Sequence, residues 1–395
     1  MKRRIGIVGG GIIGLALAYK LSKSSDYQVT LFEKEMEVGK HQSGRNSGVL
    51  HCGLSYQPGS LKAKLAKNGI EQMKLFCSTH GVPFDICGKI VVASNNIEEY
   101  FLNQLAEKGR KNGLKGLKFL DQNQVLKKEP NIRATKCLFV PEEGIVDFKM
   151  VMKKMALSIK NNNGEIRCGI EIRKINDQHN EILISDDKKD YVFDMIINAG
   201  GLHSDKLFYK FTGNRRPIRI IPFRGEYFKF KDRYSNVFNN LVYPVANPKF
   251  PFLGVHFTRM INGSKEVGPN AVLALKREGY DKLNFNFNDL VDTLSYSGLF
   301  NFIRNNFKFT FQEFVSSLSI ESFVEKGRKL IPDLKKEMLD IGISGVRAQA
   351  IDGKGDLLMD FFVVRKNNQI HLLNTPSPGA TASLSIADYI IKHYI

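Results

Sequence analysis

The stretch RIGIVGGGIIG, from Arg4 to Gly14, decides the fold. Its first half is an apolar run typical of a buried parallel strand, and its second half carries Gly9, Gly11 and Gly14 in the spacing G-x-G-x-x-G. These glycines allow a tight turn, a close approach of phosphate to the backbone, and close packing of the following helix on the strand. The helix N-terminus then presents N–H groups to the phosphates. The stretch therefore predicts a nucleotide-binding sheet.

An acidic residue in the expected position strengthens this interpretation. A second predicted strand, 28–32, ends in Glu33, 19 residues after Gly14. An acid at this distance can accept the ribose hydroxyls of an adenosine. Together the strand, the helix and the acid favour dinucleotide binding over a glycine-rich turn in an unrelated parallel sheet. Ile12 and Ile13, at the helix N-terminus, and Lys34 are predicted to contact the same ligand.

Length and composition set limits on the class of protein. With 395 residues, 43% of them hydrophobic and 25% charged, the chain is long enough for two globular domains. Its apolar runs are too short to span a bilayer, so we expect no transmembrane segment. The five cysteines are scattered without a C-x-x-C pair, which favours reduced thiols in a cytoplasmic protein over a disulfide framework or a metal site.

The net charge of +18 is the unusual bulk property. Such a charge attracts an anionic substrate, an anionic membrane face or nucleic acid. The basic residues are spread along the chain, without a long basic tail or a nucleic-acid-binding motif. We therefore favour compositional drift combined with attraction of an anionic substrate, and expect no nucleic acid partner.

Three further segments are predicted to border the cofactor. The loop 39–53 is rich in small and polar residues and follows Glu33, so it is expected to wrap the middle of an extended dinucleotide. The apolar run 194–198 ends in a second glycine turn, and the C-terminal segment repeats the order of strand, small-residue turn and helix. The residues predicted to contact the cofactor in these segments, and at the end of the strand 164–172, are His41, Ser43, Arg45, Asn46, Ser47, Gly48, Ile172, Ala199, Gly200, Ser377, Gly379, Ala380 and Thr381.

The remaining segments predict a second domain. Residues 216–262 alternate apolar and polar positions as in an antiparallel sheet, whereas 288–329 is helical and rich in phenylalanine. That helical segment is predicted to pack in a core, with a membrane-docking or partner face as the alternative. The fold class is α/β, with a discontinuous Rossmann-type cofactor domain (1–85, 146–215 and 336–395). A mixed, largely antiparallel α+β domain with helices (86–145 and 216–335) is expected to bind the substrate.

Several longer blocks resemble one family. They are HQSGRNSGVLHCG (41–53), PGSLKA (58–63), PFRGEY (222–227), FLGVHFT (252–258), GPNAVLA (268–274), KREGY (276–280), GVRAQA (345–350) and PSP (376–378). Together with the glycine motif, these blocks resemble the L-2-hydroxyglutarate dehydrogenases and oxidases, which are FAD enzymes of the D-amino-acid-oxidase-like superfamily. The resemblance runs through the whole chain. Gly379 departs from it, because the family usually has alanine there, and we expect the smaller residue to be tolerated.

The resemblance implies a reaction and a cofactor. It implies FAD-dependent oxidation of L-2-hydroxyglutarate to 2-oxoglutarate by hydride transfer to flavin N5. One alternative is oxidation of another small acid, such as an amino acid or glycerol 3-phosphate. A less favoured alternative, motivated by the positive charge, is an FAD-containing protein that modifies or binds RNA.

The implied reaction needs a carboxylate clamp and a base. Arg347 is the first candidate for the clamp, because the superfamily uses an arginine in this strand segment to bind the substrate carboxylate. Arg224 and Arg277 are candidates for the second carboxylate, with ion pairs to Glu226 or Glu278 as the structural alternative. His256 and His51 are the candidate bases, since histidine titrates near neutral pH. His256 has the better claim, and His51 is expected to border the flavin.

The electron acceptor stays open at this level. Dioxygen and a quinone are both compatible with the sequence. We expect a cytoplasmic enzyme, and a quinone acceptor would add peripheral contact with the inner membrane.

Overall fold

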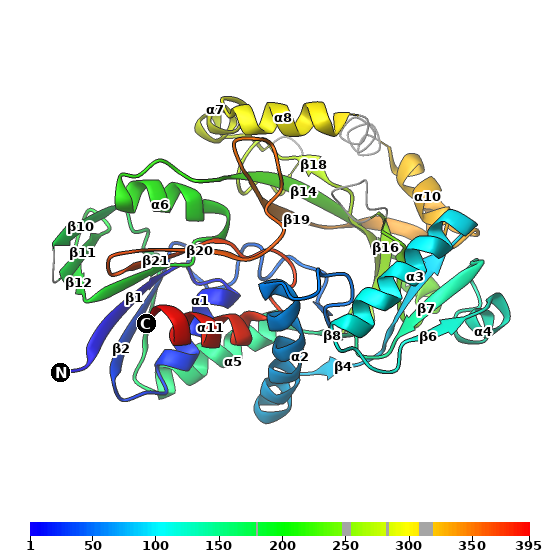
Figure 1. Cartoon of the computed structure of the whole chain (residues 1–395), viewed down its shortest axis with the longest axis horizontal. Helices are drawn as coiled ribbons and strands as arrows, with labels where there is room; N and C mark the ends of the chain where they lie inside the picture. The colour runs from blue at the N-terminus through cyan, green and yellow to red at the C-terminus, as the bar shows by residue number, and fades with distance from the viewer. Residues whose placement is uncertain (179–180, 247–253, 282–283, 308–318) are drawn as a thin grey trace.

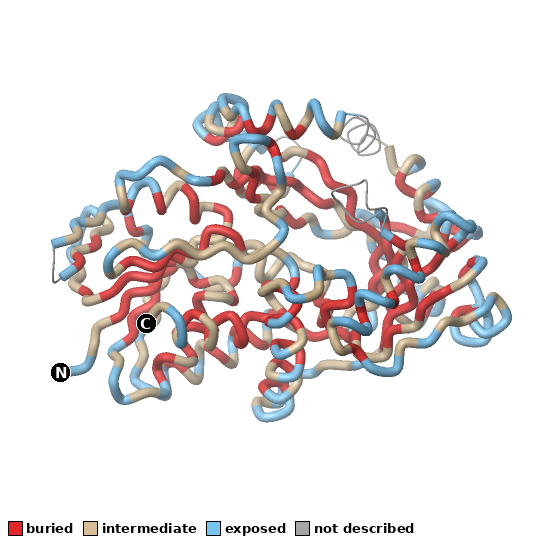
Figure 2. Tube along the Cα trace, in the orientation of Figure 1, coloured by how far each residue is buried: buried red, intermediate tan, exposed pale blue. Residues whose placement is uncertain are grey.

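The structure is a computed structural model that describes residues 1–178, 181–246, 254–281, 284–307 and 319–395. Two large β-sheets lie next to each other, and helices cover them (Figure 1). The strands of both sheets are largely buried (Figure 2). The predicted α/β class is confirmed.

The first sheet has six strands around the glycine motif. Their order is β20 (Phe362–Lys366), β21 (Gln369–Asn374), β13 (Met195–Asn198), β1 (Arg3–Val8), β2 (Tyr27–Glu33) and β9 (Glu165–Cys168). All neighbouring pairs are parallel except β20 with β21. Parallel strands are buried on both faces, which explains the uninterrupted apolar runs in the sequence.

Helices cover one face of this sheet and a small sheet covers the other. The helices that share its main core are α1 (Ile12–Leu21), α2 (Leu61–His80), α5 (Phe148–Asn161) and α11 (Ser383–Tyr394). On the opposite face the core joins Val8 and Phe32 to Ile182 and Ile184. The last two belong to a meander of β10 (Lys174–Gln178), β11 (Glu181–Ser185) and β12 (Asp190–Phe193).

The second sheet has nine strands and is mostly antiparallel. Its order is β18 (Val272–Leu273), β14 (Arg219–Phe230), β17 (Lys265–Gly268), β16 (His256–Arg259), β15 (Leu241–Pro244), β5 (Lys89–Ala93), β7 (Lys136–Val140) and β6 (Lys118–Leu120), with β19 (Leu339–Ile351) also paired to β14. A short sheet of β3 (Val49–Leu50), β8 (Gly144–Val146) and β4 (Phe84–Asp85) lies apart from both.

The strand β19 requires a correction to the predicted domain limits. The segment 336–395 was assigned to the cofactor domain, but β19 pairs with β14 from Arg219 to Phe230, so residues 339–351 belong to the nine-stranded sheet. Between β19 and β20 the chain forms only an isolated bridge, from Leu357 to Ile351. The other domain limits stay a prediction.

The remaining helices described are α3 (Asn96–Lys111), α4 (Gln122–Lys128), α6 (Ser204–Thr212), α7 (Phe287–Leu294), α8 (Ser297–Asn305) and α10 (Ile320–Arg328). Of these, α6 packs against β21 of the first sheet and β10 of the meander, and the others lie along the larger sheet (Figure 1). Phe302 and Phe323 are buried as predicted for a core, whereas Phe287, Phe300 and Phe307 are exposed. Phe314 and Leu318, also predicted to pack in this core, lie outside the described residues. Among the helices described, none is long and apolar enough to cross a membrane.

Candidate active site

One large cavity runs from the glycine turn of the first sheet to the strands of the second. Its volume is about 1740 Å³. Pockets for drug-sized ligands usually measure roughly 300–1,000 Å³. The cavity therefore has room for an extended dinucleotide and a small second molecule.

The glycine motif adopts the conformation that its spacing predicts. Gly9 has a φ of +117°, and a Cβ there would lie 2.4 Å from the carbonyl oxygen of Ala199. A Cβ on Gly14 would lie 2.0 Å from the carbonyl oxygen of Gly9, so Gly14 supports the turn from below and does not line the cavity. A Cβ on Gly11 would meet only Ser43 Oγ within 4 Å, so this glycine leaves the backbone open to the cavity.

The N-terminus of α1 faces the same space. Its N-cap residue, Gly11, provides no side-chain cap, and the N–H of Ile12 donates to Ser43 Oγ at 2.9 Å. Uncapped N–H groups at a helix N-terminus, with the positive end of the helix dipole, form a site for phosphate.

Glu33 is fixed at the end of β2. Its carboxylate accepts hydrogen bonds from the N–H groups of Gly10, at 2.8 Å, and Glu35, at 2.9 Å. The residue is buried but lines the cavity. A carboxylate held in this way at the strand end is positioned to accept hydroxyl groups from a ribose.

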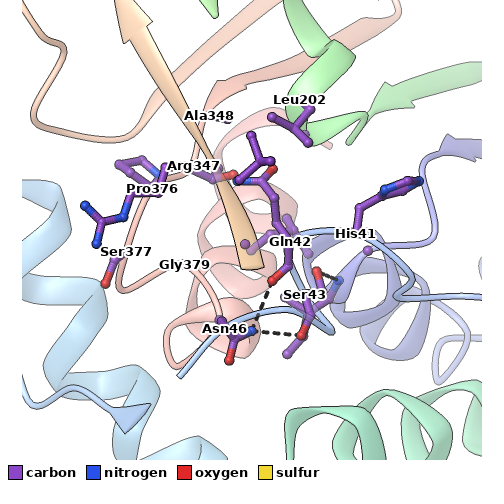
Figure 3. Close-up of a pocket in the computed structure, with 18 of the residues that line it drawn as sticks. His41, Gln42, Ser43, Asn46, Leu202, Arg347, Ala348, Pro376, Ser377 and Gly379 are labelled. Atoms are coloured by element: carbon purple, nitrogen blue, oxygen red, sulfur yellow. Dashed lines mark hydrogen bonds between the residues drawn. The ribbon is translucent and has the colours of Figure 1, made fainter. Parts of the chain in front are cut away.

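The loop after β2 is braced by its own side chains. Asn46 donates to the carbonyl oxygens of Gln42, at 3.2 Å, and Ser43, at 2.8 Å, and accepts from the N–H of Gly48 at 3.0 Å. Gly48 has a φ of +65° and supports the loop without lining the cavity. Figure 3 shows this loop between His41 on one side and Arg347 on the other.

The C-terminal turn forms another wall. Thr381 Oγ1 accepts from the N–H of His51 at 3.1 Å and donates to the carbonyl oxygen of Val49 at 3.2 Å, which ties the turn before α11 to the segment 49–51. A Cβ on Gly379 would lie 2.5 Å from the carbonyl oxygen of Thr375. Glycine is therefore the residue that fits this turn without adjustment.

Nearly all predicted site residues line the cavity. The predicted cofactor contacts that line it are Gly9, Gly11, Ile12, Ile13, Glu33, Lys34, His41, Ser43, Arg45, Asn46, Ser47, Ile172, Ala199, Gly200, Ser377, Gly379, Ala380 and Thr381. Arg347, His51 and His256 line it as well.

His256 is held as a neutral imidazole. It begins β16, is 5% exposed, and stacks on the ring of Tyr243 with centroids 4.1 Å apart. Its Nδ1 lies 3.0 Å from the carbonyl oxygen of Gly254, so Nδ1 carries the proton and Nε2 is an acceptor. Burial lowers the pKa of His256 to about 3, and the charges of Arg347 and Lys89 act in the same direction.

His51 has an acidic partner instead. Its Nδ1 lies 3.3 Å from Oε2 of Glu143, which is buried. The other oxygen, Oε1, pairs with the ammonium of Lys89 at 2.8 Å. Burial raises the pKa of Glu143, but Lys89 and His51 outweigh it and lower the pKa to about 2. The carboxylate is therefore ionised at neutral pH.

Arg347 reaches the cavity from the middle of β19. It lies opposite Phe223 of β14 in the strand register, and its backbone neighbours Gly345 to Gln349 line the cavity too. Its charge opposes the effect of burial on the pKa of Tyr227, another lining residue. The structure thus brings Arg347, His51 and His256 into one cavity.

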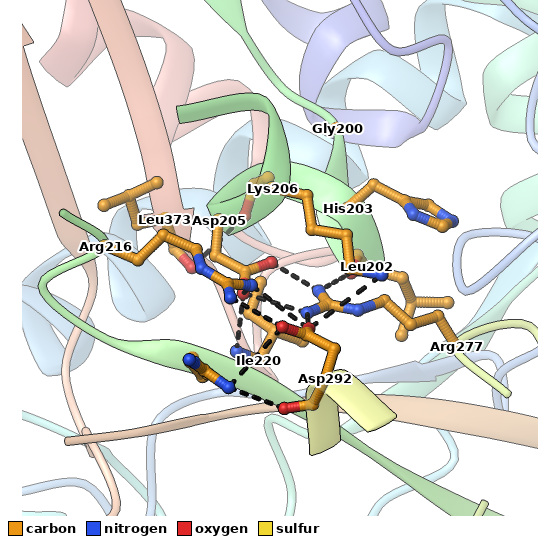
Figure 4. Close-up of polar contacts among 12 residues, drawn as sticks. Gly200, Leu202, His203, Asp205, Lys206, Arg216, Ile220, Arg277, Asp292 and Leu373 are labelled. Atoms are coloured by element: carbon orange, nitrogen blue, oxygen red, sulfur yellow. Dashed lines mark hydrogen bonds and ion pairs between the residues drawn. The ribbon is translucent and has the colours of Figure 1, made fainter. Parts of the chain in front are cut away.

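The other two predicted clamp residues do not reach it. Arg277 is buried, and its guanidinium pairs with Asp205 and with Asp292, at 2.9 Å from the latter, and donates to the carbonyl oxygen of Leu202 at 2.6 Å (Figure 4). Arg224 is 6% exposed and pairs with Glu226 at 3.3 Å. Neither lines the cavity, so placing them in a substrate clamp was wrong. Both guanidinium groups form ion pairs with carboxylates of the protein itself.

The charged residues of the cavity that sequence reasoning missed include Lys62, Lys89 and Glu143. Lys89 stands in the apolar strand CGKIVVA (87–93), and a lysine in a buried strand signals a buried partner. Lys62 lies in the block PGSLKA, and burial lowers its pKa to about 8. Nothing in the sequence around Glu143 indicates burial, because the turn 141–144 has the acidic composition of an ordinary exposed turn.

One group of acidic and histidine side chains has a metal-like arrangement. Glu35, His41 and Glu278 place one ligand atom each within 4.8 Å of one another. The ammonium of Lys34 lies 2.5 Å from Glu35 Oε1 and 2.9 Å from Glu278 Oε1, so a protein cation already occupies the position of an ion.

Comparison with known proteins places the chain in a family. A family of FAD-dependent oxidoreductases, DAO, matches residues 4–392. L-2-hydroxyglutarate dehydrogenase from Indibacter alkaliphilus is 43% identical over 98% of this chain and 97% of its own length, and the enzyme of that name from Escherichia coli is 38% identical over 98% and 92%. The structure is also similar to an FAD-bound L-α-glycerophosphate oxidase from Mycoplasma pneumoniae, with a TM-score of 0.82 at 24% identity over 99% of this chain and 94% of the other. The chain belongs to the DAO family of FAD-dependent oxidoreductases and, within it, to the L-2-hydroxyglutarate dehydrogenases.

Proposed function

We propose that this enzyme oxidises L-2-hydroxyglutarate to 2-oxoglutarate. The observation that carries the proposal is the convergence of Arg347, His51 and His256 in the cavity that begins at the glycine turn. An α-hydroxy diacid needs a cation for its carboxylates and a base for its hydroxyl proton, and these residue types provide both. When bound, FAD supplies the acceptor for the hydride that leaves the hydroxyl-bearing carbon.

The cavity fits FAD. Its pyrophosphate would be held by the N-terminus of α1 and the open backbone at Gly11, and its ribose by Glu33. The braced loop with Ser43, Arg45 and Asn46 would hold the middle of the cofactor. The turn from Ser377 to Thr381 and the N-terminus of α11 would border the flavin.

His51 is the base in this proposal, which reverses the order expected from sequence. His256 is buried with a pKa of about 3, so it resists taking a proton. Its Nε2 is an acceptor suited to orienting the substrate hydroxyl. His51 lies beside an ionised carboxylate, which stabilises an imidazolium once the hydroxyl proton has arrived.

Arg347 binds the carboxylate next to the reacting carbon. Its planar guanidinium offers two parallel hydrogen bonds to that group. Lys62 replaces Arg224 and Arg277 as the candidate for the distal carboxylate, because it lines the cavity, is buried, and lies 4.8 Å from the ring centroid of Tyr56.

Anaerobic flavin reduction tests the function directly. The FAD-loaded protein is mixed with L-2-hydroxyglutarate, its D-isomer, glycerol 3-phosphate and L-amino acids, and bleaching of the flavin absorbance is followed. We expect rapid bleaching by L-2-hydroxyglutarate and at least about 100-fold slower bleaching by the others. Ligands with a single carboxylate leave charges of the site unpaired, and the D-isomer, with both carboxylates bound, cannot place its hydrogen and its hydroxyl group in the same positions as the L-isomer. Faster bleaching by another acid would reassign the substrate.

For the acceptor we propose a membrane quinone rather than dioxygen. Large apolar side chains are exposed on and beside α7 and α8: Phe285, Phe287, Val291, Leu294, Phe300 and Phe307. An exposed apolar patch on a strongly basic protein suits contact with an anionic membrane. The test is sedimentation with anionic vesicles and turnover with a vesicle-bound quinone; no vesicle binding, with turnover sustained by dioxygen alone, would overturn this part.

A further inference from the structure

Glu143 is a buried carboxylate with two different partners, one for each oxygen. Oε1 pairs with Lys89 at 2.8 Å and accepts from Cys52 Sγ at 3.3 Å. Oε2 faces Nδ1 of His51 at 3.3 Å. The side chains of Glu143 and Lys89 are only 1% and 8% exposed, whereas that of His51 is 23% exposed and lines the cavity.

Charge balance indicates what each partner does. A buried carboxylate is stable only when it is paired and hydrogen-bonded, and Lys89 alone neutralises Glu143. The contact with His51 therefore is not needed to neutralise the acid. It fixes the ring: an ionised carboxylate at Nδ1 requires the proton on that nitrogen, which leaves Nε2 as the acceptor.

Other titratable and charged groups lie near the pair of Glu143 and Lys89 and near His256. The titratable and charged side chains gathered around the Glu143 pair and His256 are Cys52, Tyr56, Glu142, Tyr227, Tyr243, His256 and Arg347. Arg347 is a fixed cation, and burial raises the pKa of Cys52 and of Tyr243, so these two stay neutral at neutral pH. Glu143 and Lys89 are the paired charges nearest to the ring that substitution can remove one at a time.

We infer that Glu143 is the positioning residue for His51, and that Lys89 opposes its electrostatic effect. Glu143 orients the ring and stabilises the imidazolium formed when Nε2 takes the substrate hydroxyl proton. Lys89 holds the carboxylate in place and offsets its charge, so that the imidazolium can release its proton before the next turnover. The inference rests on the proposed function, in which His51 is the base.

The first test is Glu143→Gln, which keeps the shape and removes the charge. We expect the anaerobic rate of flavin reduction to fall roughly 10- to 100-fold, within the range of effects seen for general bases and the groups that orient them. The KM should change little, and the acid limb of the rate profile should move to lower pH, because the imidazolium loses its counter-ion. Glu142→Gln is the matched control, since that carboxylate instead accepts from the N–H of Lys115, and its profile should match the wild type.

Lys89→Met supplies the opposite change. Without the ammonium, the charge of Glu143 acts fully on His51, so the acid limb should move to higher pH. A general packing defect would not move the limb in opposite directions in the two variants. Shifts in the same direction, or no shift in either folded variant, would overturn the inference, and Lys89→Met alone decides if Glu143→Gln does not fold.

Two measurements separate this inference from the proposed function. In a double-mutant cycle, adding Glu143→Gln to His51→Gln should cause no further loss of rate; multiplied losses would mean that Glu143 acts independently of His51. Imidazole NMR of the FAD-loaded protein needs no substrate: the His51 ring should titrate at lower pH in Glu143→Gln than in wild type. If none of the acids in the flavin-reduction test bleaches the flavin, the proposed function fails. The titration still supports or overturns the interaction of Glu143 with His51 in that case.

Discussion

Two clusters of buried charges in this molecule look alike but differ in what they face. In one, Glu143 joins Lys89 and His51 at the cavity. In the other, Arg277 joins Asp205 and Asp292, next to the short connection that leads into α6 (Figure 4). The acids Glu143 and Asp205 are 1% and 0% exposed, so burial does not distinguish them.

The difference lies in the third member of each cluster. The cavity cluster includes an imidazole, which can gain and lose a proton and borders the space for substrate. The Arg277 cluster contains guanidinium groups, carboxylates and a backbone carbonyl but no imidazole, and Arg216 adds a second guanidinium at 2.5 Å from Asp292. A buried ion pair is thus weak evidence of function by itself. An ion pair beside a titratable side chain that faces a cavity is stronger evidence of a catalytic role.

The cluster around Arg277 still supports the cavity indirectly. Lys276 and Glu278, on either side of Arg277, both line the cavity, so anchoring Arg277 fixes the segment that borders it. This leads to the largest effect that we expect, because removing one partner of a buried pair leaves an uncompensated charge.

Arg277→Ala should lower the free energy of unfolding by about 3–5 kcal/mol. The protein that remains folded should reduce its flavin with an unchanged KM for L-2-hydroxyglutarate. Chemical denaturation and stopped-flow reduction measure the two quantities. The exposed Arg215, replaced by Ala, is the control and should leave stability unchanged. A raised KM in Arg277→Ala with normal stability would mean that Arg277 binds the substrate. The two clusters would then not differ in function.

Arg347→Ala should show the reverse pattern. We expect kcat/KM to fall by about 100-fold or more, since truncating one side of a desolvated charge pair costs about 2–5 kcal/mol. FAD content and unfolding should stay near wild type, and Arg347→Lys should recover only part of the loss, because an ammonium lacks the planar two-point geometry. Equal losses of turnover and of FAD retention would mean that Arg347 is not a substrate residue.

The contrast between the clusters also explains what could be predicted from sequence. The glycine spacing, Glu33 and the small-residue turns act locally, through backbone conformation and strand ends, so residues 9–14 and 376–381 could be placed without a structure. Arg277 could not, because its partners Asp205 and Asp292 become neighbours only through the fold. For Arg224 the sequence offered both the substrate and the nearby Glu226 as partners, and the structure shows the ion pair with Glu226. The pairing of β19 with β14 could not be predicted either. Alternation of apolar and polar residues predicts a strand, but it does not predict which sheet the strand joins.

Glu33→Ala tests the cofactor end of the cavity. Loss of the carboxylate should weaken FAD binding by about 10- to 100-fold, the value of a hydrogen bond to a charged group. Glu33→Gln should lose less, because its amide oxygen can still accept from the N–H of Gly10. Equilibrium titration of the apoprotein with FAD, followed by flavin fluorescence, measures the affinity. An unchanged dissociation constant in Glu33→Ala would remove the ribose role.

The smallest expected effect concerns Lys62, and it extends the comparison to a cation without a strong partner. Burial lowers the pKa of Lys62 to about 8, with Asp360 opposing the shift weakly. The ammonium is therefore present below about pH 8 and lost above it, so attraction for the distal carboxylate should weaken as pH rises through that value. We expect the KM for L-2-hydroxyglutarate to rise a few-fold between about pH 7 and 9, since the charged fraction of a group with a pKa of about 8 falls from roughly 90% to roughly 10% over this range. Lys62→Arg should flatten this rise, because guanidinium keeps its charge throughout the range. A rise of the same size in wild type and Lys62→Arg would assign the pH dependence to another group and leave the distal carboxylate without its proposed partner.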